Sequence, residues 1–204
     1  MAAMRRLVMG ISGASGMIYA VRFIRALPDE YELHVVFSDV AKKVMKTETG
    51  WDADKQPFEK FMIKHYREEV HPKNIIFHSH DDHYAGIASG SFHVDGMIVI
   101  PCSMKTLSGI ANGYAQTLTE RAADVSLKER RPTILVVREA PYNRIHLKNM
   151  LSATEAGATI MPASPAFYHN PANIDELTDF IIARVFNALN IPQNLVRGWG
   201  EKKN

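Results

Sequence analysis

Short apolar runs alternate with amphipathic segments along most of the chain. The apolar runs predict six strands, over residues 6–11, 31–37, 74–77, 96–100, 133–137 and 159–161. Segments with helical spacing predict helices over residues 15–27, 39–48, 103–111, 119–131, 145–156 and 174–189. Residues 49–74 are polar and mixed and predict no element, while residues 87–92 are typical of a helix or a turn.

This alternation favours an α/β fold, a Rossmann-like (flavodoxin-like) parallel sheet with helices on both faces. No repeat or low-complexity linker interrupts the pattern, so we expect residues 1–204 to form a single domain. Ligands of such sheets bind at the carboxyl ends of the strands. Four predicted strands end in small or polar residues, at 10–15, 38–39, 101–106 and 138–141. We therefore expect these four clusters to line one crevice.

Charge and cysteine content narrow the class of protein. The formal net charge is only +2, so the sequence predicts no broad surface for nucleic acid. The single cysteine, Cys102, allows no intrachain disulfide and is typical of the reducing cytoplasm. No apolar stretch approaches the ~18 residues of a membrane helix. We expect a cytoplasmic protein without a membrane partner.

The loop after the first strand, GISGASG, is a candidate phosphate site. Its glycines follow the spacing GxxGxxG, so the GxGxxG dinucleotide fingerprint is not met, although Asp39 keeps a nicotinamide cofactor open. Hydroxyls of Ser12 and Ser15 at a helix start suit a phosphate. The loop CSMKT offers Ser103 and Thr106 at a second helix start. Two such loops favour a nucleotide phosphate over small residues that only let a helix pack on a strand.

The segment HSHDDH matches HxHxDH, the metal signature of metallo-β-lactamase-type hydrolases. Its side chains His78, His80, Asp82 and His83 could together hold zinc. Those enzymes open with antiparallel strands, whereas this chain opens with a strand, a glycine loop and a helix. No later segment resembles their additional ligand loops. We therefore favour a polar surface loop.

Three further features carry candidate chemistry. Arg121 and Lys128 are seven residues apart on one helix face, where they form either a solvated surface or a phosphate clamp shared with a neighbouring subunit. The spacing of these two cations, taken by itself, favours the solvated surface. Arg138 and Glu139 follow a buried strand, and Glu139 can donate a proton if burial raises its pKa. Cys102 is interpreted as an inert buried thiol.

Together these motifs resemble those of a known family, the flavin prenyltransferases of the UbiX type, whose members are also named after phenolic acid decarboxylase. The resemblance covers nearly the whole chain in one register. It is carried by GISGASG (10–16), TET (47–49), ASGSF (88–92), DGMIVIPCSMKTLSGI (95–110), ERAADVSLKERRP (120–132), VREAP (137–141), HLKNML (146–151), PAFYH (165–169) and RGWGE (197–201).

The resemblance implies a Rossmann-like flavoprotein, a homododecamer with sites at subunit junctions. Reduced FMN would be alkylated at N5 and C6 by dimethylallyl phosphate, with no metal required. The product, prenylated FMN, would serve a UbiD-type decarboxylase in ubiquinone biosynthesis or aromatic acid decarboxylation. Two alternatives remain open: a non-catalytic FMN-binding component of a decarboxylase system, and the HxHxDH metal-dependent hydrolase.

Site residues follow from the same resemblance. It implies that the flavin contacts are Gly13, Ala14, Ser15, Ser38, Ser103, Met104, Lys105, Thr106 and Arg138. Catalysis would use Ser15 beside N5, the acid Glu48, the cation Lys128 and Glu139, which would protonate the departing phosphate. The dimethylallyl phosphate would be bound by Arg121, Lys128, Tyr168, Arg184 and Trp199. Some relatives carry a Trp where this chain has His83, followed by Tyr84, so the aromatic wall of the prenyl site is expected to differ.

Overall fold

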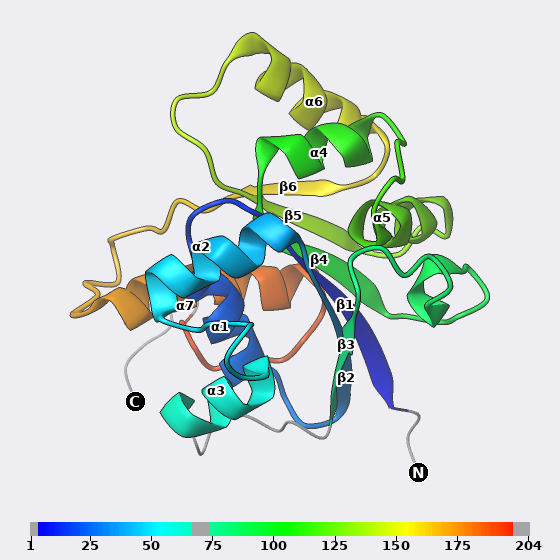
Figure 1. Ribbon diagram of the computed structural model, residues 1–204. Coiled ribbons are helices and arrows are strands. Elements are labelled where there is room, and N and C mark those ends of the chain that lie inside the picture. Colours follow the sequence, from blue (N-terminus) through cyan, green and yellow to red (C-terminus); the bar gives the residue numbers. More distant parts are fainter. Residues whose placement is uncertain (1–3, 67–73, 198–204) are drawn as a thin grey trace.

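The computed structural model describes residues 4–66 and 74–197 and contains one six-stranded sheet in which all strands run parallel (Figure 1). The strand order is β3-β2-β1-β4-β5-β6. The strands are β1 (Arg5–Ile11), β2 (Tyr31–Phe37), β3 (Ile75–His78), β4 (Gly96–Cys102), β5 (Thr133–Val137) and β6 (Thr159–Pro162). This is the Rossmann order, whose direction reverses between β1 and β4 and leaves a crevice there. The expected Rossmann-like parallel fold is confirmed.

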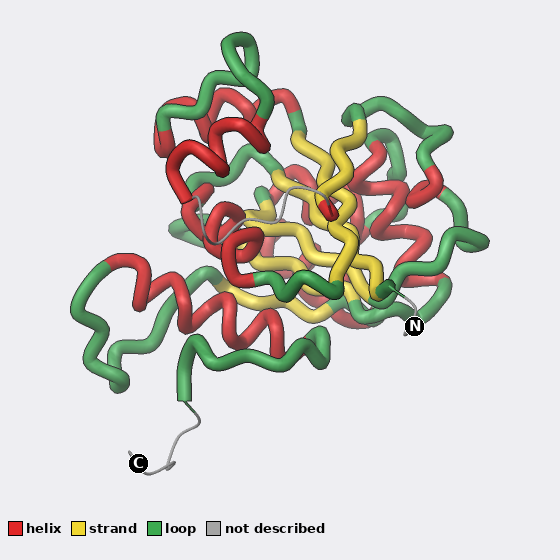
Figure 2. Tube along the Cα trace, turned by 90° about the horizontal axis from the view of Figure 1, so that it is seen from below, coloured by secondary structure: helices red, strands yellow, loops and turns green. Residues whose placement is uncertain are grey.

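Helices cover both faces of the sheet (Figures 1 and 2). They are α1 (Met17–Ala26), α2 (Asp39–Thr49), α3 (Phe58–Tyr66), α4 (Met104–Ala111), α5 (Leu118–Lys128), α6 (Arg144–Glu155) and α7 (Ile174–Ala188), with a short 3₁₀ turn, η2 (Gly86–Ala88). Side chains of α1, α2, α3 and α7 pack into one core, and those of η2, α4, α5 and α6 into another. Among the described residues, no helix is long and apolar enough to span a membrane.

Alternating residues of β1 show how the sheet separates the two cores. Leu7 and Met9 pack with α1 and α7, whereas Val8 packs with α4 and α5. All seven residues of β4 are buried, because a central parallel strand is covered on both faces. These continuous apolar runs are why the sequence pattern located the strands well.

Two elements differ from the sequence expectation. The segment 49–74 contains α3, whose Phe58, Phe61 and Met62 are buried under the edge of the sheet. The strand expected to end before Pro101 continues to Cys102. Its pairing with β5 shifts between Val99 and Cys102, and the missing N–H of proline is tolerated at such an irregularity.

Helices α4 and α5 approach closely at Gly109. Glu120 of α5 is buried, and its Oε2 accepts hydrogen bonds from the backbone N–H groups of Gln116 and Thr117 at 3.0 and 3.1 Å. A Cβ added at Gly109 would overlap the other oxygen, Oε1. The absence of a side chain at this position therefore allows the capping box of α5 to sit against α4.

Candidate functional site

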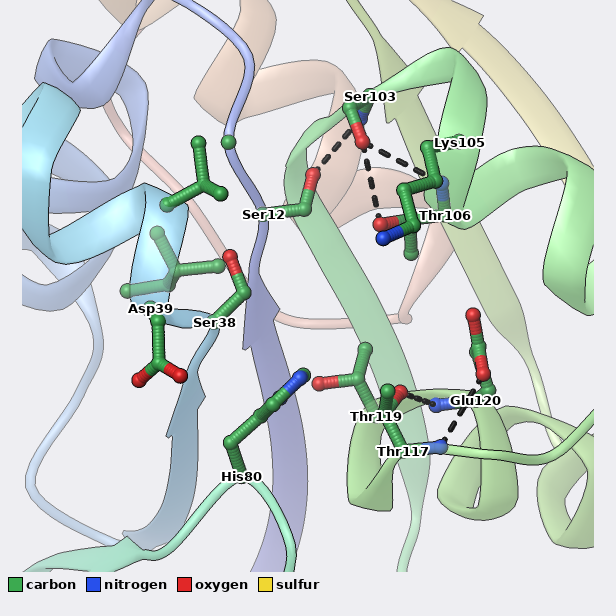
Figure 3. A pocket seen from close by; sticks show the side chains of 13 residues that line it. Ser12, Ser38, Asp39, His80, Ser103, Lys105, Thr106, Thr117, Thr119 and Glu120 are labelled. Atoms are coloured by element: carbon green, nitrogen blue, oxygen red, sulfur yellow. Dashed lines mark hydrogen bonds between the residues drawn. The ribbon is translucent and has the colours of Figure 1, made fainter.

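A cavity of about 360 Å³ opens at the carboxyl ends of β1, β2 and β4, where the strand order reverses (Figure 3). We call it the strand-end cavity. It is lined by Ile11, Ser12, Gly13, Ser38, Asp39, Val40, His80, Ser103, Lys105, Thr106, Thr117, Thr119 and Glu120. Three of the four clusters expected to share a crevice contribute to it. The fourth, which follows β5, does not line it.

Ser12 lines the strand-end cavity, but its hydroxyl proton is used within the protein. Its Oγ donates to the carbonyl of Pro101 at 2.8 Å and accepts the N–H of Ser103 at 2.7 Å. The bonds join the ends of β1 and β4 in a buried position. Ser12 therefore fixes the two loops, and in this structure its hydroxyl donates to Pro101 and not toward the cavity.

Ser38 and Ser103, two further serines of the cavity, cap helices, and hydroxyl groups beside them keep bonding capacity. Ser38 Oγ accepts the N–H of Ala41 at 3.1 Å and can still donate. Ser103 Oγ accepts the N–H of Thr106 and donates to its hydroxyl, which leaves the Thr106 proton for a ligand. Because α4 also directs its positive N-terminal end at the cavity, this part of the site suits a phosphate.

Two of the expected flavin contacts, Ala14 and Met104, are buried and do not line the strand-end cavity, whereas Ser15 is exposed just before α1. Gly16 adopts the left-handed conformation at φ 103°, which favours glycine, and it has no side chain to cap the helix. Glu48 of α2 supplies the missing acceptor. Its carboxylate accepts the N–H groups of Gly16 and Met17 at 3.0 and 2.8 Å.

The Glu48 contact predicts a stability effect separate from catalysis. Glu48→Ala removes the acceptor for both N–H groups and is expected to cost about 1 kcal/mol of unfolding free energy. Glu48→Gln keeps an acceptor oxygen and should cost less. Urea denaturation measures both, with Lys43→Ala on the exposed surface of α2 as the control. Equal stability of Glu48→Ala and wild type would contradict this capping role.

Arg138 and Glu139 occupy the loop between β5 and α6, where residues 138–145 are all exposed. Glu139 makes only a local contact, in which its carboxylate accepts the N–H of Ala140 at 3.1 Å. Within the described residues, the protein does not bury this acid. A bound ligand or a neighbouring subunit would have to provide the expected burial.

The two expected phosphate-binding cations of α5 are paired within the chain, and Arg121 also holds the loop 88–92. Arg121 donates to the carbonyl of Ala88 at 3.1 Å and pairs with Asp124 at 2.7 Å. Lys128 pairs with Glu129 at 2.5 Å, beside Gly90. Both cations are therefore engaged within the chain but remain partly exposed.

Tyr168 and Arg184 line a second cavity, of about 150 Å³, which we call the arginine cavity. Arg197 also lines it, and neither arginine has an acidic partner among the described residues. The strand-end cavity and the arginine cavity share no lining residue. Trp199, expected to close the prenyl site, lies outside the described residues.

The HxHxDH side chains do not converge on one point. The ring of His78 stacks on His34, with Nε2 and Nδ1 2.8 Å apart, and burial together with the neighbouring His34 lowers the pKa of His78. His80 lines the strand-end cavity, while His83 and Tyr84 are exposed. Within 4–66 and 74–197, no three His, Cys, Asp or Glu side chains are grouped to hold a metal.

Cys102 lies at the end of β4 and is completely buried. Burial raises the pKa of its thiol to about 12, so the thiolate is not available near neutral pH. The interpretation of Cys102 as an inert thiol is confirmed.

The sequence did not predict four polar side chains of the strand-end cavity, and Glu120 of α5 is one of them. Thr117 and Thr119 enter it from the first turn of α5, and His80 enters from the loop after β3 (Figure 3). The capping pattern of α5 was a usable signal for Thr117. His80 was noted only as part of the metal-like motif.

Comparison with known proteins supports a flavin-binding site in this chain. The chain matches the family model described as Flavoprotein over residues 1–186. It is 41% identical over 195 residues to the flavin prenyltransferase UbiX of Methanocaldococcus jannaschii, covering 96% of this chain and 98% of that protein. It is 43% identical over 200 residues to flavin prenyltransferase UbiX of Escherichia coli K12, with coverages of 96% and 98%.

Solved structures extend the similarity to three dimensions. AnUbiX (PadA1), crystallised with FMN and dimethylallyl pyrophosphate, superposes with a TM-score of 0.84 at 36% identity, over 98% of this chain and 99% of that one. A dodecameric FMN-dependent UbiX-like decarboxylase from Escherichia coli O157:H7 gives a TM-score of 0.79 at 40% identity, over 91% and 95%. The similarity thus spans the strand-end cavity and the arginine cavity alike.

Proposed function

This chain belongs to the UbiX family of flavin prenyltransferases, and we propose that its strand-end cavity binds the FMN that it modifies. In this proposal the chain is a prenyltransferase that joins the dimethylallyl group of dimethylallyl phosphate to N5 and C6 of reduced FMN and releases phosphate. Its relatives are named flavin prenyltransferases, and AnUbiX was crystallised with FMN and dimethylallyl pyrophosphate. The observation that carries the proposal is the convergence of Ser38, Thr106 and the N-terminus of α4 on one cavity at the strand ends.

The chemistry of the cavity fits the phosphate end of FMN. Ser38 and Thr106 retain hydroxyl protons, and Lys105 adds a cation at the rim. Gly13 lies so close to Val40 that a Cβ would overlap it, so the loop can pack directly on α2. Ala14, Ser15 and Arg138 would contact the flavin beyond the phosphate, and Glu48 would keep the Ser15 loop in place.

Reduced FMN supplies the two nucleophilic atoms, and the chain must make phosphate a better leaving group. Lys128, Arg121 and Arg184 would neutralise its charge, and Tyr168 would orient it. Preorganised cations aimed at a developing phosphate can lower a barrier by several kcal/mol. Glu139 would donate the proton that the departing phosphate takes up. Trp199 would exclude water from the allyl cation.

We further propose that this site is assembled between subunits. The expected phosphate ligands occupy different parts of one chain, on α5 and in the arginine cavity. Helix α6, next to Glu139, exposes Ile145, Leu147 and Leu151 at 66, 54 and 59%. Such a cluster is typical of a surface covered by another subunit. These features support a homo-oligomer, and a dodecamer is our specific proposal.

We also propose that the enzyme works in the cytoplasm and delivers prenylated FMN to a UbiD-type decarboxylase. The single, fully buried cysteine fits a reducing compartment. Release of a modified flavin requires a recipient protein that uses it.

The direct test is the mass of the flavin product. The chain is incubated anaerobically with reduced FMN and dimethylallyl phosphate, with and without a chelator. We expect the flavin to gain one dimethylallyl group at the expense of a proton, equally in both samples. An unchanged flavin mass with FMN still bound would favour a non-catalytic flavin-binding component. An unchanged flavin mass together with stoichiometric zinc in the purified protein would favour the hydrolase.

A further inference from the structure

The loop after β3 carries His80 to a fixed position at the strand-end cavity. The carbonyl of His80 accepts the N–H of Leu118, the first residue of α5, at 2.9 Å. The loop is closed beside it by a hydrogen bond from the N–H of Asp82 to the carbonyl of Ser79 at 3.2 Å. The backbone of His80 is therefore anchored to the same helix that supplies Thr117 and Thr119 to the cavity.

The side chain of His80 has unused hydrogen-bonding capacity. Its Nδ1 is buried and has no hydrogen-bond partner within the described part of the chain. Figure 3 shows the ring extending from the loop into the cavity, between Ser38 on one side and Thr119 on the other. The protein covers Nδ1, so the ring nitrogen that a ligand in the cavity can reach is Nε2.

The surrounding groups identify what that partner should be. The two acids that line the cavity do not compete for the imidazole. Glu120 is bonded to the N–H groups of the α5 capping box, and Asp39 pairs with Lys42 at 3.3 Å. What remains is a set of donors, namely hydroxyls, Lys105 and the N-terminus of α4. Donors that converge with an imidazole favour an anionic oxygen-rich group.

We propose that His80 is a specificity-determining residue that donates a hydrogen bond to the phosphate of bound FMN. This inference rests on the proposed function of the strand-end cavity. It gives the histidine of the metal-like motif a role without a metal. It also makes His80 a residue through which the chain selects FMN over riboflavin, the same flavin without the phosphate.

The test measures the dissociation constants of FMN and riboflavin by quenching of flavin fluorescence, on the whole protein at constant salt. His80→Ala should weaken FMN binding about 10- to 100-fold, as expected for a hydrogen bond to a charged group. Riboflavin binding should change less than about twofold. His80→Gln, which keeps a donor, should recover part of the loss. His93→Ala, an exposed histidine that does not line the cavity, is the control and should bind both flavins like wild type.

Other results overturn the inference in distinguishable ways. Equal weakening of both flavins by His80→Ala would place the contact on the ribityl chain or the ring. Unchanged FMN affinity in both His80 variants would remove His80 from the site. Wild-type protein that binds neither flavin would overturn the proposed function itself. If His80→Ala does not fold, the FMN-to-riboflavin ratio of His80→Gln decides, because loss of selectivity is expected only for a phosphate contact.

Discussion

Glu139→Gln is expected to bind FMN with wild-type affinity and to lose turnover about 100- to 10,000-fold, the usual contribution of a general acid. The side chain is exposed and contacts only the neighbouring N–H of Ala140, so an isosteric amide leaves the fold unchanged. The amide cannot release a proton to the departing phosphate. Single-turnover product mass and flavin fluorescence measure the two quantities separately.

Glu155→Gln, an exposed acid at the end of α6, is the control and should match wild type in both measurements. Turnover within twofold of wild type in Glu139→Gln would show that the phosphate leaves without this proton. A parallel loss of FMN affinity would instead assign Glu139 to flavin binding.

Gly109→Ala is expected to destabilise the chain by roughly 2–3 kcal/mol, although the same change in an exposed helix usually stabilises. The new Cβ would overlap Oε1 of Glu120. To make room, the buried carboxylate must leave the N–H groups of Gln116 and Thr117, and an unpaired buried charge is costly.

Ser108→Ala, one position earlier in α4, is the matched control and should stay within about 0.5 kcal/mol of wild type. Urea denaturation of the three proteins gives the comparison. Equal stability of the two variants would mean that α4 and α5 can separate without loss of the capping box.

The hydrophobic pattern of the sequence predicts most of the strands and helices, because the sheet is buried on both faces. β2 and β5 have the bounds that their apolar runs predict. The same reasoning missed α3, because its apolar residues Phe58, Phe61 and Met62 stand among charges in a segment without a clear start signal. The continuation of β4 through Pro101 depends on pairing with neighbouring strands, which a local pattern does not contain.

The residues of the candidate site could be predicted only in part from the sequence, for a related reason. Strand ends and helix caps identified Ser38, Ser103 and Thr106. Whether a hydroxyl is available, however, depends on partners far along the chain, as with Ser12 and the carbonyl of Pro101. His80 reaches the cavity because its loop is bonded to α5, again a long-range contact. The phosphate ligands rest on the family resemblance, and their meeting between subunits remains a prediction.

Because α6 exposes apolar side chains, we expect folding and assembly of the protein to depend on its own concentration. Ile145, Leu147 and Leu151 cost free energy in water, and only association removes them from it. Folding and assembly are then linked equilibria, in which each added copy draws the chain toward the folded, associated state. Because loop 138–143 precedes α6 directly, the position of Glu139 is set by the same equilibria. In our proposal, dilution therefore lowers the fraction of complete sites before it unfolds the chain.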